Sequence, residues 1–135
     1  MLSLFELMQD KAPALKVGAH QMVFTAARLM AEAKLGAVLV SDAYEGVTGI
    51  FTESDCLRKV TARGLDPAMT TLRLVMKPIV CYAKFDQSVE DCLHQMIENG
   101  LHHLPVLDAD RRVIGILSID DLLNDGLSEH EVSIN

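Results

Sequence analysis

Two short motifs in the sequence hold residue types that could bind a phosphorylated sugar. They read GIFTESD and GILSIDD, begin at Gly49 and Gly115, and share a glycine, two apolar residues, a Ser or Thr, two further residues and an Asp. A hydroxyl and the exposed N–H groups at a helix start can donate hydrogen bonds to a phosphate. A carboxylate one turn later can accept hydrogen bonds from two neighbouring hydroxyls, such as those of a ribose. The candidate binding residues are Thr52, Asp55, Ser118 and Asp121.

The same spacing also has a purely structural interpretation. A Ser or Thr three residues before an acidic residue is typical of a helix N-cap with a capping box. A single copy of the motif favours this interpretation. Its repetition does not decide the matter, because a duplicated unit also duplicates its caps. Both interpretations stay open from the residues alone.

The motifs belong to an internal repeat that spans most of the chain. When the sequence is shifted by 66 residues, Met22–Leu57 aligns with Ser88–Leu123 without a gap. More than ten of these aligned positions hold the same residue, and many of the others are conservative. A repeat of this kind indicates two copies of one structural unit.

Each copy shows the same order of expected elements, which must position the motif. A leading strand precedes an amphipathic helix, two short apolar strands follow as a hairpin, and a closing helix starts inside the motif. The expected leading strands are 14–17 and 79–82, the expected helices are 22–34 and 89–99, and the expected hairpin strands are 37–40, 47–51, 104–107 and 113–117.

The repeat predicts an α+β fold of two strand-helix-strand-strand-helix units around a pseudo-twofold axis. A unit of about 60 residues is marginal alone, whereas two such units can bury one shared face. The expected boundaries are 6–61 for the first repeat, 62–72 for a linker, 73–127 for the second repeat and 128–135 for a tail.

Composition argues against several classes of protein. The net charge of −7 argues against binding of a nucleic-acid backbone, which needs a basic face. Three cysteines without a C-x-x-C pair do not form a disulfide framework, and no stretch reaches the ~20 apolar residues of a membrane span. Without a basic N-terminal region typical of a signal peptide, the sequence predicts a cytoplasmic protein that does not bind a membrane.

Motifs for catalysis or metal binding are also missing from the sequence. It holds no phosphate-binding G-x-x-x-x-G-K-[ST] loop, no dinucleotide-binding G-x-G-x-x-G fingerprint and no nucleophile elbow. Its histidines do not form a recognised metal-binding motif with acidic or cysteine residues. We therefore expect no enzyme activity, no catalytic cofactor and no metal.

Two blocks of the sequence resemble a known family. GIFTESDCLRKV and HHLPVLDADRRVIGILSIDDLL are similar to the paired signature of cystathionine-beta-synthase (CBS) domains, and the resemblance extends over about 6–126. The chain looks like the small stand-alone tandem-CBS proteins of bacteria. The resemblance implies a CBS pair that packs through its sheets, often dimerises, and binds AMP, ADP, ATP, NAD or S-adenosylmethionine in clefts between the repeats.

The resemblance also assigns roles to residues of this chain. It implies that the motif hydroxyls of Thr52 and Ser118 contact phosphate and that the carboxylates of Asp55 and Asp121 contact ribose. It further implies that the adenine lies against apolar residues of the leading strand and the motif strand. The matching positions are Pro78, Ile79 and Val80 with Ile116 in the second repeat, and Pro13, Ala14 and Leu15 with Ile50 in the first.

Charged residues near the motifs distinguish the two repeats. His102 and His103 match a place where many family members carry a basic residue that reaches phosphate, and packing of the strand is the alternative. Asp120 is a departure, because a carboxylate there would repel a polyphosphate unless it points to solvent. In the first repeat Arg58 and Lys59 could offset the charge of a longer ligand, although a solvated helix face is their more typical role.

The sequence therefore predicts a regulatory module that binds an adenosine nucleotide and reports its occupancy to a protein effector or a homodimer interface. The alternative is a dimerisation or docking module whose clefts are vestigial and empty.

Overall fold

The structure, a computed structural model, describes residues 3–9, 11 and 13–123. These residues form two compact units. Ala14–Val80 is called here the Thr52 unit. The described residues up to 13 and from 81 onward together form the Ser118 unit. The N-terminal segment thus packs with the second repeat, although it precedes the first in the sequence.

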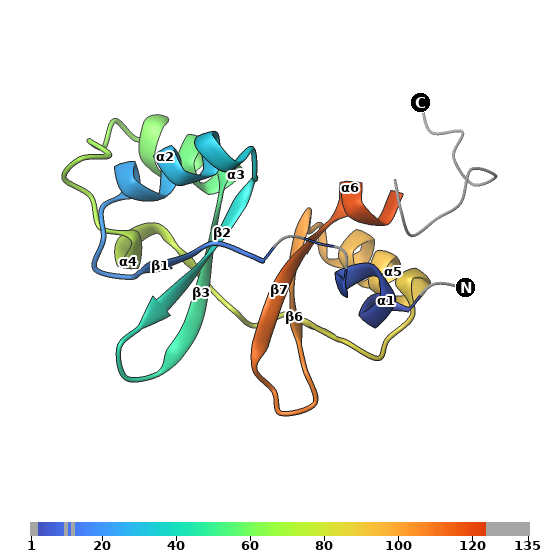
Figure 1. Cartoon of the computed structure of the whole chain (residues 1–135). Coiled ribbons are helices and arrows are strands. Elements are labelled where there is room, and N and C mark those ends of the chain that lie inside the picture. Colours follow the sequence, from blue (N-terminus) through green and yellow to red (C-terminus); the bar gives the residue numbers. More distant parts are fainter. Residues whose placement is uncertain (1–2, 10, 12, 124–135) are drawn as a thin grey trace. The chain divides into compact units, whose positions relative to one another are not determined.

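A four-stranded sheet with the order β1-β2-β3-β4 forms the base of the Thr52 unit (Figure 1). β1 is parallel to β2, whereas β2 pairs with β3 and β3 with β4 in antiparallel fashion. Gly46 turns the β2–β3 hairpin at a φ of +77°, a conformation that favours glycine. The strands are β1 (Lys16–Gly18), β2 (Ala37–Asp42), β3 (Gly46–Thr52) and β4 (Lys77–Pro78).

Helices of the Thr52 unit bury an aliphatic core against this sheet. α2 (Val23–Ala33) joins β1 to β2, and α3 (Glu53–Asp55) continues directly into the π-helical segment η1 (Cys56–Thr61). α4 (Leu72–Val75) precedes β4. The fully buried core side chains are Val23, Ala26, Val38, Val40, Phe51, Val60 and Leu72.

The Ser118 unit repeats this plan on a three-stranded sheet with the order β5-β6-β7. The strands are β5 (Ala83–Lys84), β6 (His103–Leu107) and β7 (Val113–Ser118), and the helices are α1 (Leu4–Gln9), α5 (Val89–Asn99) and α6 (Ile119–Asp121). Figure 1 draws α1 beside α5. Both helices contribute to one core, because Leu4 and Leu7 cluster with Val89, Cys92 and Met96.

The α+β architecture and the hairpin-plus-helix plan of each repeat are confirmed, with strand and helix ends within two residues of the expected ones. The expected leading strand at 79–82 is wrong. The strand lies at Ala83–Lys84, where Ala83 pairs with Val106 just as Val17 pairs with Val40. The preceding residues are held elsewhere, because the Ile79 N–H donates to the Thr48 carbonyl of β3 at 3.1 Å.

Two short helices, α1 and α4, were not expected from the sequence, because neither is long enough to show a clear apolar period. The predicted tail, 128–135, lies outside the described residues. Across residues 3–9, 11 and 13–123, no helix has the length and apolar character needed to cross a membrane.

Candidate functional site

Both motifs fold as complete capping boxes. The Asp55 N–H donates to Thr52 Oγ1 at 3.1 Å, and the Thr52 N–H donates to Asp55 Oδ2 at 3.0 Å. The Asp121 N–H donates to Ser118 Oγ at 3.1 Å, and the Ser118 N–H donates to Asp121 Oδ2 at 2.8 Å. The structural interpretation of the motif is therefore confirmed. It leaves each hydroxyl proton, and one oxygen of each carboxylate, outside the capping box.

A glycine starts each motif because a neighbouring methionine approaches the strand there. A Cβ atom on Gly49 would lie 2.5 Å from Met76 Sδ and 3.2 Å from the carbonyl oxygen of Lys77. A Cβ atom on Gly115 would collide with the terminal methyl group of Met8. The glycines thus let the segment before each leading strand lie close to a motif strand.

In the Thr52 unit, lysines neutralise the motif carboxylate. The Asp55 side chain is only 5% exposed, and its Oδ1 atom lies 3.5 Å from Lys59 Nζ and 3.6 Å from Lys77 Nζ. Lys59 also donates to the Val75 carbonyl at 3.2 Å. Because Oδ2 accepts the Thr52 N–H, both carboxylate oxygens of Asp55 already have partners.

In the Ser118 unit, the motif carboxylate is more open. The Asp121 side chain is 25% exposed, and its Oδ2 atom lies 2.8 Å from Lys11 Nζ. Its other oxygen, Oδ1, has no hydrogen bond or ion pair within the described part of the chain. Burial alone would raise the pKa of Asp121, but the hydrogen bonds from Lys11 and Ser118 outweigh burial and lower it. This carboxylate is therefore ionised and has an oxygen left to accept a ligand hydroxyl.

The two histidines lie where the sequence comparison of the repeats places them. His103 is directly opposite Ser118 in the β6–β7 ladder, and the His102 carbonyl accepts the Ile119 N–H at 2.9 Å. Ala37 and Gly36 occupy the same two places opposite Thr52 and Glu53. Directly opposite residues of an antiparallel ladder project to the same face, so the imidazole of His103 lies on the face of the Ser118 hydroxyl.

The apolar candidates differ in how they are placed. Ile50 and Ile116 are each 6% exposed. Pro78 of β4 pairs with Gly49, the residue before Ile50. The segment that the sequence analysis expects near Ile116 therefore runs along β3 of the Thr52 unit. Val80 in this segment is 82% exposed.

The other predicted adenine-facing residues are less buried than the isoleucines. The Leu15 carbonyl accepts the Leu39 N–H at 2.8 Å, which ties the first leading segment to β2. Ala14 and Leu15 are half-buried and Pro13 is exposed.

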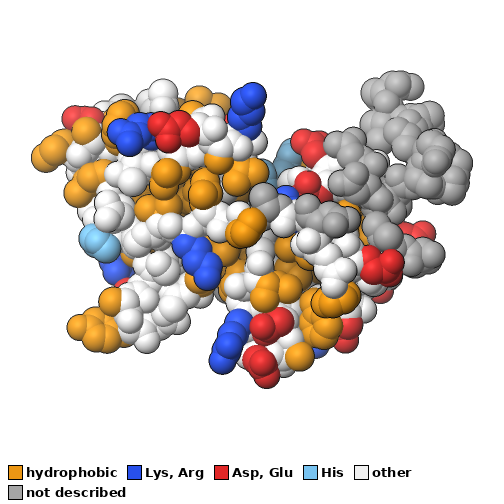
Figure 2. Space-filling view, viewed as in Figure 1, with side chains coloured by type: hydrophobic (Ala, Val, Ile, Leu, Met, Phe, Trp, Pro, Cys, Tyr) orange, Lys and Arg blue, Asp and Glu red, His pale blue; other side chains and the backbone are white. Residues whose placement is uncertain are grey.

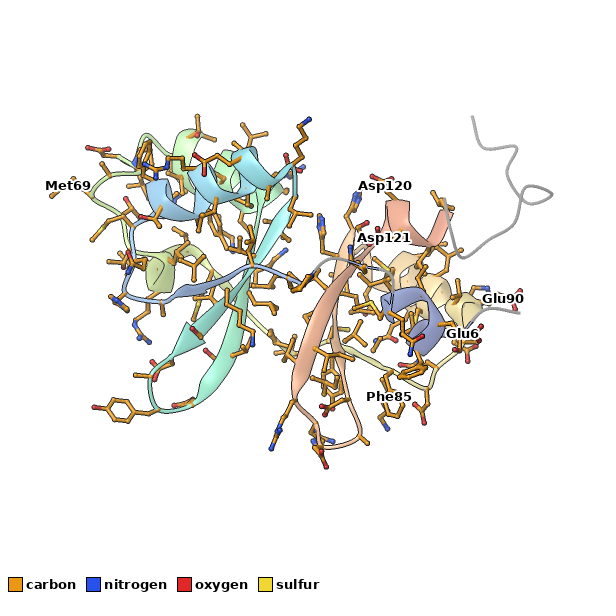
Figure 3. All side chains as sticks on the ribbon, viewed as in Figure 1. Glu6, Met69, Phe85, Glu90, Asp120 and Asp121 are labelled. Atoms are coloured by element: carbon orange, nitrogen blue, oxygen red, sulfur yellow. The ribbon has the colours of Figure 1, made fainter. Side chains whose placement is uncertain are left out.

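Two lysines near the motifs, Lys11 and Lys77, are not indicated by the sequence. Of the two basic residues expected beside Asp55, Arg58 is exposed and has no ion pair among the described residues, whereas Lys59 contacts Asp55. The i,i+4 spacing of Asp55 and Lys59 could have identified this contact. Lys77 and Lys11 come from segments distant in the sequence, so no local pattern indicates their pairing. Asp120 is exposed, and Figure 3 labels it beside Asp121 on α6.

A groove of about 570 Å³ lies elsewhere in the Thr52 unit, between α2 and the α3–η1 helix. Met30, Cys56 and Leu57 line it, and Leu57 is 61% exposed. Figure 2 shows hydrophobic side chains gathered over α2 and α3. Within residues 3–9, 11 and 13–123, no group of three His, Cys, Asp or Glu side chains could hold a metal ion.

Comparison with protein families gives a direct match. The model of the CBS domain matches residues 4–62 and 72–127. The CBS domain-containing protein CBSCBSPB2 of Arabidopsis thaliana is 33% identical over 118 residues, which are 87% of this chain and 22% of the relative. The chain spans between 16% and 22% of the length of the first three curated relatives.

Solved structures give a similar result. A protein with CBS domains from Burkholderia ambifaria is 30% identical and has a TM-score of 0.86, over 99% of this chain and 100% of that chain. The CBS domain protein PAE2072 from Pyrobaculum aerophilum, which is complexed with AMP, has a TM-score of 0.81 over 92% of each chain. Its identity of 20% makes this second likeness one of fold.

Proposed function

The chain belongs to the CBS-domain family and carries two copies of the domain, and from this premise we propose that it is a non-catalytic module that binds an adenosine nucleotide and transmits the occupancy of its site to a partner. The supporting observation is the set of groups around Ser118. A serine hydroxyl and an ionised carboxylate with one open oxygen lie within one helical turn. A lysine ammonium from the N-terminal segment contacts the carboxylate, and an imidazole lies opposite the hydroxyl. These groups suit phosphate and ribose.

Each group has a defined role in the proposed complex. Ser118 donates its hydroxyl proton to a phosphate oxygen, and Asp121 Oδ1 accepts the ribose hydroxyls. Ile116, on the same strand as Ser118, offers apolar surface to the adenine. Thr52 and Asp55 have the same residue types, but the Asp55 carboxylate must give up a lysine before it can accept a ribose.

Among AMP, ADP and ATP, the charges favour AMP. A triphosphate would bring several negative charges beside the Asp121 carboxylate, which has a single lysine as counter-ion, whereas the exposed Asp120 adds little to the repulsion. PAE2072, a protein of the same fold, is complexed with AMP, which supports this ligand class.

A thermal-shift panel with AMP, ADP, ATP, NAD, S-adenosylmethionine and GTP tests the proposal. A ligand at 100 times its dissociation constant adds about 2.7 kcal/mol to the free energy of unfolding, which raises the melting temperature visibly. We expect AMP to raise it and GTP not to do so, and we expect Asp121→Asn to lose the AMP effect. If no adenosine compound shifts the melting temperature at millimolar concentration, the proposal is wrong. Intact AMP after incubation with the protein would support the non-catalytic part.

The second candidate function is a docking module with empty clefts. The complete capping boxes favour it, because they give both motifs a structural role without a ligand. Under this function no adenosine compound binds, so Asp55→Asn and Asp121→Asn change only the stability of the protein. The thermal-shift panel separates the two candidates, because only the nucleotide-binding module shows a rise in melting temperature with AMP.

A homodimer is part of both candidate functions. Leu57 and the apolar groove beside it form a surface in the Thr52 unit that a second copy of the chain could cover. Sedimentation of the wild type and of Leu57→Lys tests this, with a dimer expected for the wild type and a shift to monomer for the variant. A wild type that sediments as a monomer would contradict it. The protein effector and the cytoplasmic location stay predictions.

A further inference from the structure

One contact in the Ser118 unit joins the motif to the N-terminal segment. Lys11 Nζ lies 2.8 Å from Asp121 Oδ2, and the two side chains are 23% and 25% exposed. The same oxygen accepts the Ser118 N–H at 2.8 Å. The ammonium group therefore contacts the carboxylate that would hold the ligand, and both side chains of the pair are partly exposed to solvent.

The charge balance at this site depends on Lys11. Asp120 and Asp121 place two carboxylates on the first turn of α6. Lys84 is exposed on β5 and has no ion pair among the residues that the structure describes. Without the ammonium of Lys11, an anionic ligand would approach the uncompensated charge of the partly buried Asp121, whereas a neutral nucleoside would not be repelled.

Lys11 also has hydrogen-bonding capacity to spare. An ammonium carries three N–H donors, and the contact with Asp121 Oδ2 uses one of them. The others can donate to a phosphate oxygen while the ion pair stays formed. Asp121 keeps its Oδ1 atom for the ribose, so the pair can bind both parts of a nucleotide at once.

We infer that Lys11 is a specificity-determining residue, which makes the Ser118 motif bind adenosine 5′-monophosphate in preference to adenosine. It does so by neutralising Asp121 and by donating to the phosphate. This inference rests on the proposed function, and it adds a residue from outside the motif to the site.

The test measures the dissociation constants of AMP and adenosine by calorimetry on the full chain. Wild type, Lys11→Met, Lys11→Arg and Lys84→Met are compared. Lys84→Met is the matched control, because it removes one exposed lysine of the same unit that has no ion pair among the described residues. We expect Lys11→Met to weaken AMP about tenfold and to change adenosine by less than about twofold, as loss of one charge near a phosphate implies. Lys11→Arg keeps the preference for AMP, and Lys84→Met changes neither constant.

Three results would overturn the inference. Equal weakening of AMP and adenosine by Lys11→Met would mean that the ion pair only supports the fold. Tighter binding of both ligands would mean that Lys11 blocks the site. No change in either dissociation constant would mean that another group selects the phosphate. Failure of the wild type to bind either compound is a different result, since it removes the proposed function and the inference together.

Discussion

The two motifs have the same capping box, but their carboxylates differ in burial and in the number of lysines they contact. Asp55 is 5% exposed and touches two lysines, whereas Asp121 is 25% exposed and touches one. The backbone geometry of the two copies agrees closely, because all four capping hydrogen bonds measure 2.8 to 3.1 Å. The two copies show that one capping geometry can leave its carboxylate in different surroundings. Under the proposed function, the burial and the counter-ions of the carboxylate determine which copy can bind a ligand.

The largest expected effect on stability comes from removing the two carboxylates in turn. Asp55→Ala should lower the free energy of unfolding by about 3 kcal/mol, because it removes a cap and leaves two lysines without their buried partner. Asp121→Ala should cost about 1.5 kcal/mol, because its pair is partly solvated. Urea denaturation measures both, with Ser54→Ala and Asp120→Ala as exposed controls on the same two helices. Equal losses would contradict the difference in burial.

Substitution of the motif glycines by alanine should give the next largest difference in stability loss between the two units. Gly49→Ala should cost about 2 kcal/mol, because its Cβ atom meets both Met76 and the backbone carbonyl of Lys77. Gly115→Ala should cost less than about 1 kcal/mol, because only the flexible end of Met8 is in the way. Thermal unfolding of the two variants measures both losses of stability. A larger loss for Gly115→Ala than for Gly49→Ala would contradict this packing.

The smallest expected effect is a pH dependence in the Ser118 unit. The pKa of Asp121 is lowered in the folded state: burial raises it, but the hydrogen bonds from Lys11 and Ser118 lower it more. The stabilisation is therefore fully present above the unfolded pKa of about 3.9 and is lost as the pH falls through the folded value. Lys11→Met should lower the free energy of unfolding by about 0.5 kcal/mol at pH 6, since the pair is partly exposed.

The difference in the free energy of unfolding between wild type and Lys11→Met should vanish once Asp121 is protonated. Urea denaturation between pH 6 and pH 2 measures it, with Lys84→Met as the control that changes net charge equally. A difference that persists unchanged at pH 2 would mean that Lys11 stabilises the fold by packing rather than by its charge.

Much of this arrangement was predictable because it is encoded locally. The hairpins and the capping boxes follow from residues within one copy, and the repeat follows from the alignment of the two copies. Alternation, apolar period and capping are short-range signals, so they survive without knowledge of tertiary contacts.

The charges that distinguish the motifs were not predictable, because they depend on contacts between distant segments. Lys11 reaches Asp121 from the other end of the described chain, and Lys77 reaches Asp55 from the segment after α4. The leading strand of the second repeat was misplaced for a related reason. Ile79 has the apolar character of a strand residue but donates its N–H to β3 of the other repeat.

The most direct test of the account is a calorimetric titration of AMP into the wild type, Asp55→Asn and Asp121→Asn. The account predicts about one AMP bound per chain, with binding lost in Asp121→Asn and retained in Asp55→Asn, because only Asp121 has an oxygen open to the ribose. Binding that is lost in Asp55→Asn and retained in Asp121→Asn, or two equivalent sites per chain, would contradict it.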